Sequence, residues 1–326
     1  MPKMTMVQAI NRALDQEMAR NDRVLVLGQD VGRIGGVFRV TEGLWDKYGP
    51  QRVIDTPLAE SGILGTSIGM ALAGLRPVAE MQFSGFSYLM FPQLEGHAAR
   101  FRMRTRGRWT VPLVVRMPYG AGVRALEHHS ESKEATYAHV PGVKVVIPST
   151  PRNARALLIA AIRDPDPVVF MEPKRSYRAF REDVPEEDEV LEIGKADVVR
   201  EGTDLTLIAW GAMMRPVLEA AQDVQTRRGA SIEIIDLLTI TPMDDETIAR
   251  SVRKTGRCVV VQEASKTLGV ASEVIAVIND KALMHLEAPV RRVTGYDVSP
   301  PYFARENAYI PSPGRIARAI EETLDF

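Results

Sequence analysis

The chain has 326 residues and a formal net charge of −1, which leaves room for two ordinary domains and gives no electrostatic sign of nucleic-acid binding. Its single cysteine, Cys258, excludes an intrachain disulfide framework, a four-cysteine zinc site and a cysteine-ligated iron–sulfur cluster within the chain. No apolar run approaches a membrane-spanning length and no signal-peptide pattern opens the chain, so no membrane association and a cytoplasmic location are expected.

Helical and strand patterns alternate along the first half of the chain. Thr5 can cap a helix, because the apolar residues that follow recur at helical spacing as far as Met18. The glycine-rich run 28–43 has neither the GxxxxGK[ST] nor the GxGxxG spacing, so we expect a surface loop and not a phosphate loop. The other predicted elements are strands at 23–27, 76–83, 111–117, 143–147 and 167–172, and helices at 92–106 and 151–163.

The stretch DTPLAESGILG, residues 55–65, joins an extended segment to a helix. Thr56 precedes a proline and is therefore disfavoured in a helix, whereas the run after Glu60 is apolar and continuous. Small residues at Gly62, Gly65 and Gly69 leave one helix face almost free of side chains, which predicts close packing against a neighbour. Glu60 itself has two interpretations, a carboxylate that favours the helix N-terminus or a catalytic group.

A polar, glycine-rich segment with two adjacent histidines, His128 and His129, follows the strand at 111–117. Neighbouring side chains of an extended segment point to opposite sides, so one imidazole at most is expected to face a given pocket. Histidine titrates near neutral pH, which makes the pair a candidate for acid–base chemistry, and a surface turn is the alternative. Two histidines without a third ligand are a weak metal signal.

Residues 173–192 are charged and have no periodicity, so we place the domain boundary there, with domains at 1–180 and 181–326. Strands alternating with helices predict an α/β fold of two domains with mainly parallel sheets. The elements predicted beyond the boundary are strands at 205–210, 231–237, 257–263 and 290–293, and helices at 216–228, from 244, from 271, and at 313–324.

Several motifs occur together in one order: DTPLAESGILG, PVAEMQF, a loop ending in HHSES, PGVKVVIPSTPRNA, AIRDPDPVVFMEPKR and KTGRCVVVQEA. In this order the chain resembles, over nearly its whole length, the beta subunit of the thiamine-diphosphate-dependent, decarboxylating first component of 2-oxo-acid dehydrogenase complexes. The resemblance implies a transketolase-like pyrimidine-binding domain followed by a transketolase C-terminal domain.

The resemblance also implies roles for individual residues. Glu60 matches the glutamate that binds the aminopyrimidine ring of thiamine diphosphate and favours its imino tautomer. His129 matches a histidine that orients or protonates groups during acyl transfer to lipoyl. Leu58, Gln82 and Phe86 match positions that line the cofactor and substrate pocket.

A monovalent cation, usually potassium, is a further implication of the resemblance. The matching positions are Leu113, Ala161, Ile162, Asp164 and Asp166. Several ligands would be backbone carbonyls, which suit a hard cation. A simple turn at Asp164-Pro165-Asp166 is the alternative.

The chain has no Gly-Asp-Gly sequence, the motif with which the family holds magnesium and the diphosphate. The resemblance therefore implies an alpha subunit that supplies this half of the site, in an assembly of two alpha and two beta chains. It also implies a lipoyl-bearing acyltransferase component as partner. The glycine face of 62–69 would then contact another subunit.

Pyruvate is the expected substrate, because the ALEHHSES loop and the QFSGF run are similar to pyruvate-type subunits. The run EPKRSYR is more similar to branched-chain types, so branched-chain and acetoin dehydrogenases are the alternatives. A ferredoxin-linked 2-oxo-acid oxidoreductase is disfavoured by the lack of cysteine clusters. A non-catalytic scaffold is disfavoured because it would need neither Glu60 nor His129.

Overall fold

The computed structural model describes residues 1–326 and divides into two compact units. The first comprises Met1–Tyr119 and Thr136–Ile193, and the second comprises Gly120–Ala135 and Gly194–Phe326. Residues 181–193, beyond the predicted boundary after residue 180, stay with the first unit. One cause is the pairing of β8 (Glu182–Asp183) with β1 (Lys3–Met4).

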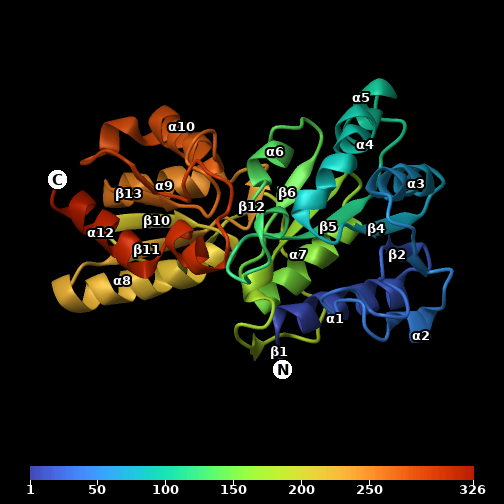
Figure 1. Ribbon diagram of the computed structural model, residues 1–326. Helices are drawn as coiled ribbons and strands as arrows, with labels where there is room; N and C mark the ends of the chain where they lie inside the picture. The colour runs from blue at the N-terminus through green and yellow to red at the C-terminus, as the bar shows by residue number, and fades with distance from the viewer. The chain divides into compact units, whose positions relative to one another are not determined.

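A parallel sheet forms the centre of the first unit, in the order β6-β7-β5-β4-β2-β3 (Figure 1). Its strands are almost wholly buried and rich in valine, which is typical of a parallel sheet covered on both faces. In chain order they are β2 (Val24–Gly28), β3 (Val53–Asp55), β4 (Arg76–Glu80), β5 (Val114–Tyr119), β6 (Lys144–Val146) and β7 (Val168–Pro173).

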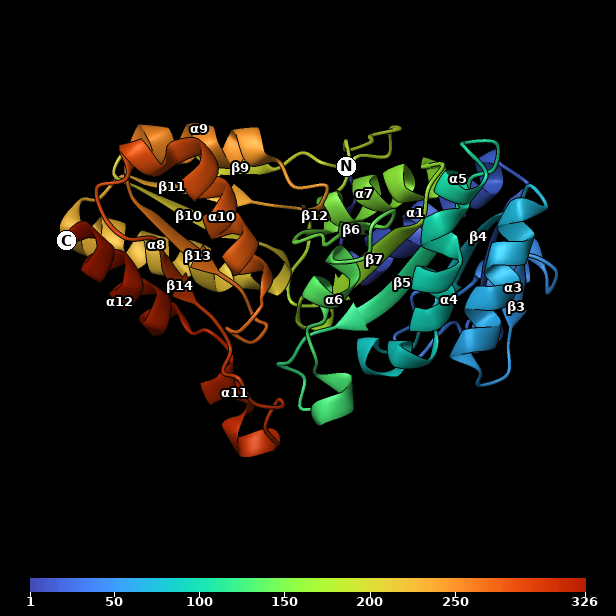
Figure 2. The ribbon, with the colours of Figure 1, turned by 90° about the horizontal axis from the view of Figure 1, so that it is seen from above.

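Helices cover both faces of this sheet. α1 and α7 pack together on one face, and α3 and α4 lie on the other (Figure 2). Thr5 and Gln8 form a reciprocal capping box at the start of α1, as the sequence predicts for Thr5. The helices are α1 (Met6–Arg20), α2 (Leu44–Tyr48), α3 (Glu60–Leu72), α4 (Phe91–Gly96), α5 (Phe101–Arg104), α6 (Glu134–Ala138, which begins in the second unit) and α7 (Pro151–Arg163).

The helix predicted at 92–106 is interrupted. Residues 84–104 form two 3₁₀ turns, η1 (Ser84–Leu89) and η2 (Ala98–Arg100), and the short helices α4 and α5. α4 ends at Gly96, and His97 leaves the helical region with φ −126°. Glycine weakens a helix interior, so the break falls where the local sequence favours it.

Helix α3 begins at Glu60 as predicted, but its glycines have no close neighbour within this chain. A Cβ atom added at Gly65 or Gly69 would meet no atom within 4 Å, and one at Gly62 would meet only the Cβ of Ala59 at 3.6 Å. The glycine face therefore opens to space around the chain. A contact of this face with another subunit stays a prediction.

The second unit has a smaller sheet in the order β14-β13-β10-β11-β9. The pairs β10–β11, β10–β13 and β13–β14 are parallel, and β9 joins the edge antiparallel. Helices α8 and α12 pack on one face, and α9 and α10 on the other (Figure 1). The elements are β9 (Asp197–Arg200), β10 (Leu205–Ala209), α8 (Met214–Arg228), β11 (Ile232–Asp236), β12 (Thr239–Thr241), α9 (Asp245–Thr255), β13 (Cys258–Val261), α10 (Val270–Ala282), β14 (Arg291–Val293), α11 (Glu306–Tyr309) and α12 (Pro313–Leu324).

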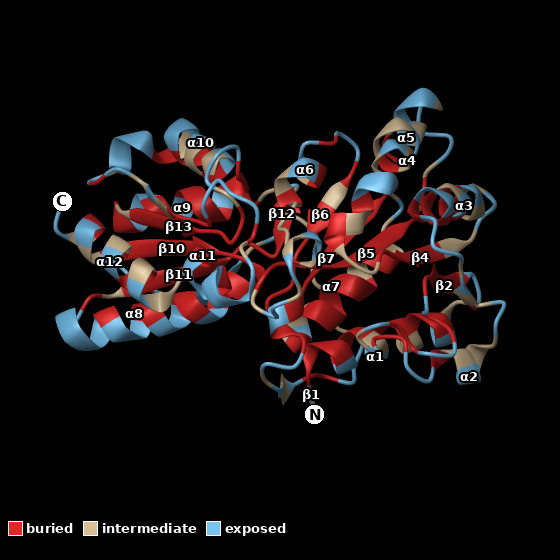
Figure 3. Ribbon diagram, viewed as in Figure 1, coloured by how far each residue is buried: buried red, intermediate tan, exposed pale blue.

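In each unit the central strands are buried, and exposed residues gather on the outer faces of the helices (Figure 3). Cys258 lies at the start of β13, wholly buried, and this burial raises the pKa of its thiol. None of the helices has both the length and the apolar character to cross a bilayer.

Candidate active site

Glu60 is the first residue of α3 and is only 3% exposed. Its Oε1 accepts a hydrogen bond from Gln29 Nε2 at 3.3 Å, while its Oε2 is buried and has no hydrogen-bond partner. The hydroxyl of Thr56, four residues earlier, is also buried without a partner. An unsatisfied buried polar group is costly, on the order of 1–3 kcal/mol, so each of these oxygens has acceptor capacity that the chain itself does not use.

The local sequence explains why Glu60 lies there. Gly28, Asp55 and Glu80 are the aligned last residues of β2, β3 and β4, so the segments that follow them leave the same edge of the sheet. Gln29 follows the first of these strands, and the segment that ends at Glu60 follows the second. Ligands of parallel α/β sheets bind at this carboxyl edge.

Gln82 lies just beyond β4 and is half-buried. Its Nε2 donates to Asp30 Oδ2 at 2.9 Å, which fixes the amide and leaves its carbonyl oxygen available. Leu58, by contrast, is 79% exposed on the segment before α3. Leu58 is therefore the most exposed of the predicted pocket residues.

Phe86 belongs to a row of aromatic rings. It packs edge-on against Phe83 at a centroid distance of 5.8 Å, and Phe83 packs against Phe38 at 5.5 Å. Phe38 in turn meets Tyr177 at 5.2 Å, and Lys174 Nζ lies 5.6 Å from the centre of the Phe83 ring. Phe38, which comes from the glycine-rich run 28–43, was not predicted as a site residue.

A buried charge cluster lies beneath these rings and was not predicted. Arg116 in β5 binds both oxygens of Glu172 in β7, at 2.7 and 3.0 Å, and Glu80 in β4 at 2.8 Å. The Tyr177 hydroxyl donates to Glu172 at 2.5 Å. Charged residues within the apolar strand runs are the only sequence signal for this cluster.

Burial and charge act against each other within this cluster. Burial raises the pKa of Glu80 although the Arg116 charge opposes the shift, and burial followed by the Glu172 charge raises the pKa of Tyr177. Burial also disfavours the Arg116 cation, but the two carboxylates outweigh it and raise the pKa of the guanidinium. Arg116 therefore stays charged and ties three neighbouring strands together.

His128 and His129 lie in the 3₁₀ turn η3 (Glu127–His129), within the second unit. His129 is half-buried and His128 is exposed. Glu60 and His129, the two predicted catalytic residues, thus belong to different units, and their joint action stays a prediction. The difference in exposure favours His129 as the member of the pair that faces a pocket.

The predicted cation positions already carry hydrogen bonds. Arg76 Nη1 donates to the carbonyls of Ile162, at 2.7 Å, and Asp164, at 3.2 Å. The carbonyls of Leu113 and Ala161 accept backbone N–H groups, those of Val168 and Asp164. The Asp166 carboxylate accepts from Arg102 at 2.7 Å, and Lys144 Nζ lies 2.6 Å from Asp164 Oδ2. No group of three or more His, Cys, Asp or Glu residues is arranged to hold a metal ion.

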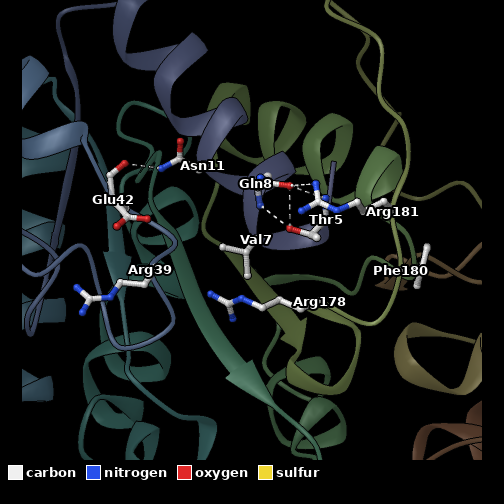
Figure 4. A pocket seen from close by; sticks show the side chains of 9 residues that line it. All are labelled: Thr5, Val7, Gln8, Asn11, Arg39, Glu42, Arg178, Phe180 and Arg181. Carbon is white, nitrogen blue, oxygen red and sulfur yellow. Dashed lines mark hydrogen bonds between the residues drawn. The ribbon is translucent and has the colours of Figure 1, made fainter. Parts of the chain in front are cut away.

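An open pocket of about 490 Å³ lies at the N-terminal end of α1 in the first unit and includes none of the predicted site residues (Figure 4). Arg178 donates to the Phe38 carbonyl at 2.7 Å and Arg181 to Gln8 Oε1 at 2.9 Å, so the basic side chains at its rim are tied to the framework. The lining residues are Thr5, Val7, Gln8, Asn11, Arg39, Glu42, Arg178, Phe180 and Arg181.

Comparison with known proteins gives one consistent family. The model of the transketolase pyrimidine-binding domain matches residues 2–179, and that of the transketolase C-terminal domain matches residues 194–316. The chain is 52% identical to the "pyruvate dehydrogenase E1 component subunit beta" of Acholeplasma laidlawii, over 98% of this chain and 97% of the relative. It is 51% identical to the protein of the same name from Bacillus subtilis, over the full length of both.

A solved structure described as a split-gene transketolase, an inactive beta4 tetramer, superposes with a TM-score of 0.82 over 99% of both chains at 23% identity. At this identity the likeness concerns the fold, and it agrees with the two domain matches. The chain therefore belongs to the transketolase-like family of beta subunits of the decarboxylating first component of 2-oxo-acid dehydrogenase complexes.

Proposed function

We propose that this chain is the beta subunit of a thiamine-diphosphate-dependent pyruvate dehydrogenase, which decarboxylates pyruvate and passes the acetyl unit to lipoyl groups. The observation that carries the proposal is the unpartnered, buried Oε2 of Glu60 at the carboxyl edge of the first sheet. The names of relatives about half identical to this chain over their full length support the same function.

The orphaned oxygens of Glu60 and Thr56 fit a ring that offers hydrogen-bond donors. Thiamine diphosphate, when bound, supplies a carbon nucleophile for the 2-oxo group and a sink for the electrons released with carbon dioxide. Glu60 Oε2 would hold a proton on the ring nitrogen that faces it, and Gln29 would fix the carboxylate through Oε1.

The remaining site residues would bind and shield the cofactor and substrate. Phe86, backed by Phe83, would provide an apolar wall that excludes water, and Gln82 would offer its free carbonyl oxygen. Leu58 would become covered when the alpha subunit binds. The domain assignment, residues 1–180 for pyrimidine binding and 181–326 for the C-terminal domain, belongs to the same proposal.

His129 would act after decarboxylation, as the group that orients or protonates the lipoyl sulfur during acyl transfer. Its partial burial and its place in a short 3₁₀ turn support a fixed orientation. An imidazole that titrates near neutral pH suits this task.

An alpha subunit would complete the enzyme in an assembly of two alpha and two beta chains, and a lipoyl-bearing acyltransferase would receive the acyl group. The chain has no Gly-Asp-Gly sequence, so the alpha subunit would hold the magnesium ion and the diphosphate. The open glycine face of α3 supports a further contact outside the chain.

A potassium ion at the turn of residues 161–166 would require Arg76 to release the carbonyls of Ile162 and Asp164. Assembly with the alpha subunit is the step at which this exchange would occur. Thermal unfolding of the assembled enzyme in potassium and in tetramethylammonium salts tests the site, because only potassium is small enough to raise the melting temperature by binding there.

Reconstitution with the alpha subunit tests the function as a whole. We expect carbon dioxide release from pyruvate that requires both subunits, thiamine diphosphate and magnesium. Comparing kcat/KM for pyruvate, 2-oxoisovalerate and 4-methyl-2-oxopentanoate then separates the pyruvate enzyme from the branched-chain alternative. A methylene in an apolar pocket changes specificity by only about 1–3 kcal/mol, so a branched-acid preference above tenfold would reverse the substrate while keeping the family.

A further inference from the structure

The segment from Gly120 to Ser132, here called the histidine loop, is held by two buried carboxylates of its own unit. Glu306, the first residue of α11, is 3% exposed, and its two oxygens accept the backbone N–H groups of Gly122 and Arg124, each at 2.9 Å. Glu263, just after β13, accepts from Ala121 N at 2.6 Å and from Ser132 Oγ at 3.1 Å through Oε1. Glu263 thereby holds both ends of the loop after strand β13, and Glu306 fastens the first half of the loop to helix α11.

The backbone of the histidine loop needs such fastening. Arg124 and Leu126 have left-handed φ angles of 58° and 66°, which are unfavourable for residues with a side chain. Gly120 has a φ of 86°, and a Cβ atom there would lie 2.8 Å from Glu263 Oε1, so the close approach of that carboxylate requires glycine. Hydrogen bonds from backbone N–H groups to a carboxylate are strong, and they can hold this strained path.

We propose that Glu306, assisted by Glu263, is a positioning residue that fixes the histidine loop and thereby aims His129 at the lipoyl group. The inference rests on the proposed function, in which His129 serves acyl transfer. The turn η3 begins directly after Leu126, so the Arg124 amide held by Glu306 lies only a few residues from the imidazole. Loss of the carboxylate would let the turn move, and the step that uses His129 would slow. The proton held by Glu60 in the first unit would not be affected.

Hydrogen exchange of the reconstituted enzyme tests the fastening without reference to activity. We expect the peptide that covers residues 120–130 to exchange about tenfold faster or more in Glu306→Ala and in the shortened Glu306→Asp. Asp244→Ala is the matched control, because Asp244 is also a buried carboxylate of the second unit that accepts two backbone N–H groups, those of Ala196 and Thr247, both at 3.1 Å. Wild-type exchange of the loop in both Glu306 variants would overturn the inference.

Two activity measurements test the consequence for His129. In Glu306→Asp, acyl transfer to lipoyl domains should fall by about tenfold or more, while decarboxylation followed with an artificial electron acceptor should fall much less. Glu306→Gln, which keeps one acceptor oxygen, should lie between wild type and Glu306→Asp. A loosened loop with wild-type acyl transfer would refute the positioning role.

The failure of the proposed function has a different signature. If His129→Ala leaves acyl transfer intact, the role of His129 is wrong. Faster exchange of the histidine loop in the Glu306 variants would then still support Glu306 as the residue that holds the loop.

Discussion

Glu60 and Glu306 are both the first residue of a helix and both 3% exposed, yet the two units use them differently. Both oxygens of Glu306 accept backbone N–H groups of the chain itself. Glu60 keeps one oxygen without a partner. Burial alone therefore does not distinguish a structural carboxylate from a functional one. An unmade hydrogen bond alone does not distinguish them either, because Glu134 and Glu233 also keep a buried oxygen without a partner. Glu60 differs by its place at the carboxyl edge of a parallel sheet, where ligands of such sheets bind.

The largest expected effect is at Glu60. Glu60→Gln should keep the fold but reduce decarboxylation by roughly 100-fold or more, the scale of a lost general acid–base group. The assay is pyruvate-dependent reduction of an artificial acceptor by the reconstituted enzyme. Glu273→Gln is the control, since Glu273 is an exposed glutamate in the first turn of α10. If Glu60→Gln is as active as Glu273→Gln, Glu60 has no role in catalysis and serves only as a favourable charge at the helix N-terminus.

Glu134 is another buried carboxylate, and its ionisation should make the stability of the chain depend on pH. Burial raises the pKa of Glu134 from 4.5 to about 7, and the charge of Glu263 adds to the rise. Hydrogen bonds from the Glu134 backbone N–H and from the Trp210 indole lower the pKa and oppose this shift. Glu134 therefore ionises more easily in the unfolded chain than in the folded one. Its contribution to the free energy of unfolding falls as the pH rises from about 4.5 to 7 and is constant above pH 7.

Glu134→Gln removes this penalty. The variant should gain stability over wild type as pH rises from about 4.5 to 7, by at most about 3 kcal/mol at pH 8, and Glu219→Gln on the exposed face of α8 should gain nothing. Urea unfolding of the chain at several pH values measures this. A gain that does not change with pH would mean that Glu134 is ionised in the folded state.

A smaller, selective effect is expected at the histidines. His129→Ala should slow acyl transfer to lipoyl domains by about tenfold more than it slows decarboxylation, whereas exposed His128→Ala should leave the ratio unchanged. Measuring both reactions on the same preparations gives the ratio directly. If His128→Ala has the stronger effect, the functional imidazole is the exposed one.

The smallest effect on the isolated chain is expected at the glycine face of α3. Gly65→Leu has space in this chain, so its melting temperature should change little, but the assembly with the alpha subunit should weaken. Glu219→Leu, which also places a leucine on an exposed helix surface but on α8 of the second unit, is the control. Sedimentation of the mixed subunits measures assembly, and normal assembly of Gly65→Leu would leave the glycines without an interface role.

Much of this could be predicted because it depends on local patterns. Thr5 and the spacing after it predict α1, and the change from Thr56-Pro57 to an apolar run predicts the start of α3 at Glu60. The tethers of the histidine loop could not be predicted, since Glu306 is 184 residues from Gly122 and no pattern links them. Arg116 was missed for the same reason, because its two carboxylates lie on other strands.

Cys258 has a practical consequence. The chain carries one thiol, it is wholly buried in β13, and its raised pKa keeps it in the unreactive protonated form. The folded protein therefore behaves towards maleimides and methanethiosulfonates as if it had no cysteine. A cysteine introduced at an exposed position, such as Thr66 on α3 or His128 in the loop, would be labelled alone. Spin or fluorescence probes could then report on each unit without first removing the native residue.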